Sequence, residues 1–151
     1  MTKNLLRTTL FTVLSSPFLF LSCDDYSSDL QSKHSDNIEF ITLLKTTKAW
    51  DGTTYTAYPT TQPEISVLKI IIPPNSTLNW HKHPVINVAY VEEGEIKVER
   101  KEDGKTQWIK KGQALGEVVN TIHRGKTGKQ AATLIVFYSG TPGTPLSEPL
   151  K

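Results

Sequence analysis

Three histidines are the residues of this sequence best suited to bind a metal ion. His81 and His83 are separated by one residue. In a β-strand alternate side chains point to the same face, so both imidazoles could reach one ion. A third ligand must come from elsewhere, and His123 is the only other histidine of the expected folded domain, because His34 lies in a polar segment that we interpret as solvated. The spacing therefore predicts a metal site built by one strand and a distant partner.

Composition narrows the kinds of site and partner. The single cysteine, Cys23, excludes an internal disulfide, a Cys-rich zinc site and an iron–sulfur cluster, so His, carboxylate or amide groups must hold any metal. The formal net charge is +2, and Lys3 and Arg7 account for the surplus because residues 1–22 contain no Asp or Glu. The rest of the chain is neutral overall. This balance argues against a nucleic-acid binder, which gathers Lys and Arg on one surface.

Short β-type runs separated by Gly, Pro and Asn predict an all-β domain, either a sandwich or a barrel. Asp103-Gly104 lies between two such runs and predicts a tight hairpin. Segment 51–63 is expected to be an ordinary loop rather than a cover over the barrel mouth, and the proline-containing tail 140–151 to be irregular. The expected strands are Ile38–Leu44, Ile65–Ile72, Thr77–His83, Ile86–Val91, Glu95–Lys101, Thr106–Lys110, Ala114–Val118, Ile122–Arg124 and Ala132–Tyr138.

Most of residues 65–138 resembles the cupin superfamily of small β-barrels. Its first motif places a Gly, a His-x-His pair, a Glu and a second Gly at fixed intervals, and its second motif adds a Gly, a Pro-x-Gly, a His and an Asn. All three histidines match at the family spacing, whereas the motif carboxylate does not. The corresponding positions here are Asn75, His81, His83, Asn87 and Gly94, then Gly112, Val118, Asn120, His123 and Thr127.

The resemblance implies a double-stranded β-helix, or jelly-roll barrel, and a metal site. Its ligands would be His81, His83 and His123, and its ion a divalent transition metal (Fe, Mn, Ni, Cu or Zn). Asn87 replaces the motif glutamate. It could bind the ion weakly, but the role we favour is a hydrogen bond to a water or ligand beside the ion. Glu117 is the nearest acid to the second motif and could supply a carboxylate or a base, but a solvated strand end is the expected place for it.

Three functions remain open at this point, because cupins host unrelated activities. The first is a metal-dependent enzyme, such as a dioxygenase or less readily an isomerase, acting on a small anionic or aromatic compound. The second is a non-catalytic cupin that binds a metal or a small ligand. The third is an interaction module in which the histidines are a relic. The sequence identifies no catalytic residue.

The N-terminus is typical of an exported protein. Lys3 and Arg7 precede the apolar stretch Leu10–Leu21, which is shorter than the roughly 20 residues that a membrane-spanning helix needs. Ser22-Cys23 resembles the bacterial lipoprotein cleavage site. We therefore expect residues 1–22 to be a signal peptide, Cys23 to be lipidated, residues 23–37 to be a flexible tether and residues 38–151 to form the barrel. The protein would then be a periplasmic or cell-envelope lipoprotein.

The expected assembly is a homodimer. Small cupins commonly dimerise through an edge strand and an outer sheet face, and a small barrel has edges to protect. The expected contacts are thus a second copy, a small-molecule ligand, and a membrane only through the N-terminal anchor.

Overall fold

The computed structural model describes residues 38–150. The predicted signal peptide, the lipidation site at Cys23 and the tether lie outside the described residues. The compact unit that carries the barrel begins at Phe40. No helix in the described range is long and apolar enough to span a membrane.

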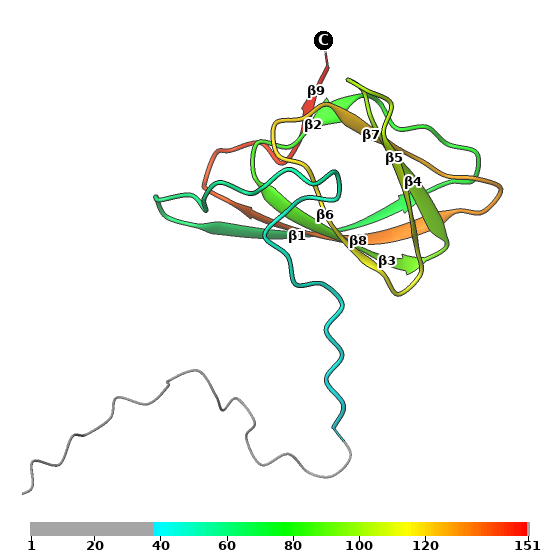
Figure 1. The fold of residues 1–151 in the computed structure, drawn as a ribbon, viewed down its shortest axis with the longest axis horizontal. Helices are drawn as coiled ribbons and strands as arrows, with labels where there is room; N and C mark the ends of the chain where they lie inside the picture. The colour runs from blue at the N-terminus through cyan, green and yellow to red at the C-terminus, as the bar shows by residue number, and fades with distance from the viewer. Residues whose placement is uncertain (1–37, 151) are drawn as a thin grey trace, which may run out of the picture. The chain divides into compact units, whose positions relative to one another are not determined.

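Two antiparallel sheets form the barrel (Figure 1). The four-stranded sheet has the order β1-β8-β3-β6, and the five-stranded sheet has the order β5-β4-β7-β2-β9. Residues 38–150 contain no helix. The strands are β1 Glu64–Ile72, β2 His81–Lys82, β3 Ile86–Glu93, β4 Glu95–Arg100, β5 Thr106–Lys110, β6 Ala114–Gly116, β7 His123–Lys126, β8 Ala132–Gly140 and β9 Glu148–Pro149.

The core lies between the sheets, because alternate side chains of each long strand face inward. Ala89 and Val91 of β3 are buried, and so are Ile96 and Val98 of β4, while their neighbours along each strand are more exposed. Burying each large aliphatic side chain contributes roughly 1.5–3 kcal/mol. This alternation fixes which side chains face the interior, including the polar ones at the histidine end of the barrel.

Glycine turns place the strands as predicted. Asp103-Gly104 joins β4 and β5 in a hairpin whose register pairs Ile96 with Ile109, so the predicted hairpin is confirmed. Gly94 lies where the chain passes from β3 in one sheet to β4 in the other, and its φ of +73° favours glycine. Apart from the region before β3, the strands from Glu64 to Gly140 lie close to their predicted ranges.

Three predicted segments differ from the structure. Segment 38–44 is not a strand, and its Ile41 and Leu43 side chains are exposed. A strand needs a neighbour to accept its hydrogen bonds, and this segment runs outside both sheets. The tail is not wholly irregular, because β9 pairs with β2 and Leu150 N donates to Trp80 O at 2.9 Å. The predicted strand Thr77–His83 is reduced to β2 with isolated bridges at its two ends.

Candidate functional site

The three predicted histidines come together at one end of the barrel. His81 in β2 and His123 at the start of β7 are direct cross-strand partners, so their side chains share a face. His83 follows β2 on the same face. The ring centroids are 4.7 Å apart for His81 and His123, 4.9 Å for His81 and His83, and 5.0 Å for His83 and His123. One ring nitrogen of each lies within 4.8 Å of the other two, so the cluster could hold a metal ion.

Backbone carbonyls fix the tautomer of all three rings. The Nδ1 atoms of His81, His83 and His123 lie 2.8, 2.7 and 2.8 Å from the carbonyl oxygens of Asn79, Leu146 and Thr121. A carbonyl oxygen only accepts, so each Nδ1 must carry the proton and donate it. The Nε2 atom of each neutral ring then keeps its lone pair, which is the state a metal requires.

Burial keeps two of these imidazoles neutral. His123 is 2% exposed and His83 is 5% exposed, whereas His81 is partly open to solvent. Burial lowers the pKa of His123 to about 4, although the hydrogen bond to the Thr121 carbonyl opposes this shift. Burial also lowers the pKa of His83. At neutral pH both rings are therefore neutral, and their Nε2 atoms carry no proton that a metal would have to displace.

The opposite sheet brings an amide and a carboxylate toward the same end. Asn87 of β3 is fully buried, and its cross-strand partner on β8 is Tyr138, whose ring packs edge-on against His83 at 5.6 Å. Glu117 follows β6, and its Oε2 atom lies 3.4 Å from His123 Nε2. The site thus draws side chains from both sheets.

The expectation that Glu117 sits in solvent is wrong. Its side chain is 11% exposed, and burial raises the pKa of its carboxyl group, an effect that the nearby His83 and His81 partly oppose. The chain is held in this position because the Tyr55 hydroxyl donates to the Glu117 carbonyl oxygen at 2.8 Å. Segment 46–55 thus covers β6, where the sequence suggested an open strand end.

Three polar atoms at this end lack hydrogen-bond partners among the described residues. They are Asn87 Oδ1, Glu117 Oε2 and His123 Nε2. A buried polar atom without a partner is costly, so such atoms are normally satisfied by water, an ion or a ligand. The donor set of imidazole nitrogens and amide and carboxylate oxygens suits a divalent transition metal.

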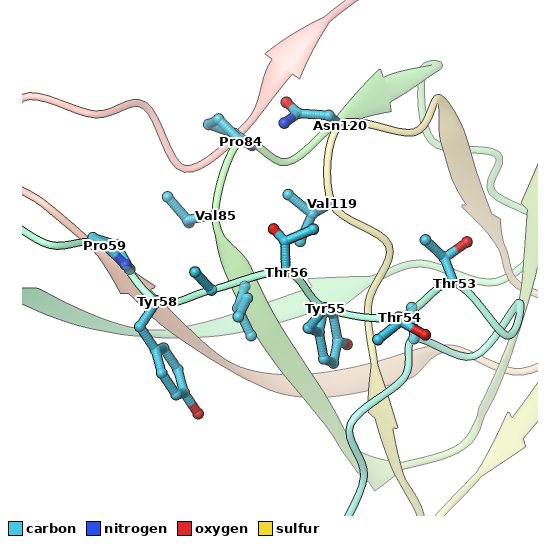
Figure 2. Close-up of a pocket in the computed structure, with 13 residues that line it drawn as sticks. Thr53, Thr54, Tyr55, Thr56, Tyr58, Pro59, Pro84, Val85, Val119 and Asn120 are labelled. Carbon is cyan, nitrogen blue, oxygen red and sulfur yellow. The ribbon is translucent and has the colours of Figure 1, made fainter.

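Cavities lie beside the histidine cluster rather than around it. One cavity of about 410 Å³ lies between segment 53–59, the residues before β3 and Asn120, and none of the three histidines lines it (Figure 2). Tyr55 and Tyr58 both line this cavity, and segment 51–63, which carries them, is a loop with one isolated bridge at Thr54. A second pocket of about 260 Å³ is lined by His81, Lys82, Asn120 and the tail around Glu148. Among the three histidines, His81 is the one that lines this second pocket.

Among the residues at this end of the barrel, Glu117 is the one whose surroundings the sequence predicted wrongly. The missing signal was its register against Asn87: the amide of Glu117 donates to Asn87 O at 3.0 Å, so the two residues lie opposite each other. That pairing joins positions 30 residues apart and depends on the sheet, which local spacing does not reveal.

Comparison with known proteins shows the fold and nothing finer. No protein-family model and no curated protein matches the sequence. Among solved structures, the DMSP lyase DddQ from Ruegeria pomeroyi aligns with a TM-score of 0.51 and 15% identity, covering 56% of this chain and 42% of that chain. The polyketide cyclase RemF from Streptomyces resistomycificus gives 0.50 and 20%, covering 58% and 61%.

A structure described as a cupin-like protein from Thermotoga maritima aligns with a TM-score of 0.49 and 19% identity, covering 57% of this chain and 64% of that chain. The chain spans less than two thirds of the length of each of these three structures. The two sheets and the two closer alignments confirm the predicted all-β jelly roll.

Proposed function

We propose, for a chain that has the cupin fold, that His81, His83 and His123 bind one divalent transition metal ion and present it to a small molecule. The observation that carries this proposal is the set of three Nδ1–H···O=C bonds, which leaves three Nε2 lone pairs at one barrel end. A bound ion would supply a Lewis acid with open positions. The histidines would hold and orient it, and Asn87 would hydrogen-bond a water or ligand beside it.

The ligand that fits this site best is a small anionic or aromatic compound. Neutral imidazoles leave the charge of a divalent ion uncancelled, and even one carboxylate would leave a net positive site. Lys82 adds a positive charge to the pocket at His81, and the Glu148 carboxylate, 3.1 Å from Lys82 Nζ, partly offsets it. A metal-dependent dioxygenase acting on such a compound is the enzymatic form of the proposal.

A non-catalytic metal- or ligand-binding role is the second candidate. The observation that favours it is that His83 and His123 are buried, so a ligand would have little room around the ion. The 260 Å³ pocket beside His81 is a place where a ligand could reach it. The solved structures named above act as a lyase and a cyclase by their descriptions, so the shared fold does not choose between reactions or between reaction and binding.

Elemental analysis of the purified protein tests the metal, and oxygen uptake with phenols, flavonols and β-diketones tests the oxidation. Stoichiometric metal with turnover supports the enzyme, and metal without turnover on this panel supports binding. A protein that takes up no Fe, Mn, Ni, Cu or Zn would contradict both.

The proposal places the protein outside the cytoplasm, as a periplasmic or cell-envelope lipoprotein. Residues 1–22 would be removed as a signal peptide and Cys23 lipidated, so that residues 23–37 tether the barrel to the membrane. Cys23→Ala should release the protein into the soluble fraction or block its processing, because the lipid would be attached to the cysteine sulfur. Mass spectrometry of the mature protein checks this. A mature N-terminus at any position other than 23 contradicts it.

The proposed assembly is a homodimer through the edge strand β1. Within the described residues β1 has a hydrogen-bonded neighbour on one side only, and its Ile65, Val67 and Ile71 side chains are exposed. Val67 is paired with Phe137 of β8, which is also exposed, so the apolar surface continues onto the sheet face. An edge strand with apolar side chains is a template for pairing with a second copy.

Val67→Asp should convert the dimer into a monomer, because a charge would be buried in the interface. Light scattering at micromolar concentration measures the change. Gln107→Asp on β5, the exposed edge strand of the other sheet, is the matched control and should remain dimeric. A wild-type protein that is monomeric at this concentration overturns the assembly.

A further inference from the structure

Glu117 occupies the position directly across the sheet from Asn87. Val88 and Gly116 are paired in the β3–β6 ladder, and one step further the Glu117 amide donates to Asn87 O at 3.0 Å. Side chains of directly opposed residues project to the same face with their Cβ atoms roughly 4.5–5.5 Å apart. A carboxylate at position 117 therefore reaches the space that a longer acidic side chain at position 87 would reach.

Glu117 Oε2 and His123 Nε2 lie close together without a hydrogen bond between them. Since His123 Nδ1–H donates to Thr121 O, its Nε2 atom is an acceptor. An ionised carboxylate is also only an acceptor, so Nε2 and Oε2 face each other at 3.4 Å with lone pairs on both sides. Both atoms are buried and without a hydrogen-bond partner in the described structure. Such a contact is stable only with a proton or a cation between the two atoms, and 3.4 Å is longer than a usual hydrogen bond that shares a proton.

The spacing of the two atoms matches a shared metal ion. Two ligand atoms that each lie about 2.1 Å from an ion at a tetrahedral angle are roughly 3.4 Å apart. The observed separation of 3.4 Å has this value, and it exceeds the usual length of an N–H···O hydrogen bond. The Tyr55 hydroxyl and the Asn87 carbonyl both bond the Glu117 backbone, so the main chain that carries this side chain is held in place.

We propose that Glu117 is the carboxylate ligand of the metal site, moved one strand over from the position where Asn87 stands. The proposal rests on metal binding by the three histidines and deepens it. It makes the ligand set three His and one Glu, with Asn87 beside the ion rather than on it. The carboxylate also cancels one charge of the ion, which three imidazoles do not do.

Titration of the purified, metal-stripped protein with Co²⁺ tests the role of Glu117. A competing chelator brings the affinity into the measurable range. Glu117→Gln should weaken Co²⁺ binding by about 100-fold and change the visible absorption of the bound ion, because a charged oxygen ligand is lost. Glu93→Gln, an exposed substitution on β3, is the matched control and should change neither. The double variant Asn87→Glu, Glu117→Gln should recover most of the affinity, since it returns the carboxylate to the neighbouring strand.

The outcomes separate this proposal from the metal site itself. Wild-type affinity and an unchanged absorption spectrum in Glu117→Gln overturn Glu117 as a ligand while leaving the three histidines in place. No Co²⁺ binding by the wild-type protein overturns both. If Glu117→Gln fails to fold, ¹³C NMR of the wild-type protein decides: the side-chain carboxyl signal of Glu117 should shift when one equivalent of Zn²⁺ binds, and an unmoved signal overturns the proposal.

Discussion

His123→Ala should leave the barrel folded and unable to hold metal tightly. His123 is the ligand that links the second motif to the His81–His83 pair, and two imidazoles of one strand then remain on that side of the site. We expect metal affinity to fall by at least ~100-fold. Metal content after dialysis against a weak chelator measures the loss, and circular dichroism of the metal-free protein verifies the fold.

Asn87→Ala is the matched comparison, because it changes a buried polar side chain at the same end of the barrel. An amide oxygen is a poor ligand beside imidazole, so this variant should keep most of its metal while disturbing the molecule bound next to it. Asn87→Glu should tighten binding by adding a negative charge close to the ion. Full metal retention in His123→Ala, or complete loss in Asn87→Ala, would show that the ligand set is wrong.

Gly94→Ala, which adds one methyl group between β3 and β4, should destabilise the barrel strongly. The residue has a φ of +73°, and a Cβ atom there would overlap the Ala131 carbonyl oxygen and lie 3.2 Å from Ala132 Cα. Both contacts are backbone, so neither can swing aside. We expect a loss of about 3 kcal/mol or more in the free energy of unfolding, which chemical denaturation of the metal-free protein measures.

Gly104→Ala is the control that separates the cost of the steric clash from the cost of the backbone conformation. Gly104 has nearly the same φ, +70°, but a Cβ atom there would meet nothing within 4 Å. Its cost should be that of the left-handed conformation alone, roughly 1–2 kcal/mol. Equal losses in the two glycine variants would mean that the close packing of Gly94 against the β8 entry does not contribute.

Local sequence was sufficient for features that depend on neighbouring residues. The alternation of a strand places His81 and His83 on one face, the Asp103-Gly104 turn specifies the β4–β5 hairpin, and the Glu64–Ile72 strand follows from its own apolar run. The third histidine was found because His123 is the only other histidine of the expected folded domain, and it also stands at the cupin spacing. These features needed no knowledge of which strand lies beside which.

Tertiary structure decided the rest, because pairing between distant strands has no local signature. The register of β6 on β3 places Glu117 opposite Asn87, and the cover by Tyr55 keeps that carboxylate out of solvent. The tail becomes β9 only because β2 leaves an edge open. Segment 38–44 has an apolar composition suited to a strand but is part of neither sheet. A side chain's type and spacing are written in the sequence, but its burial and its partner are set by the strand that packs next to it.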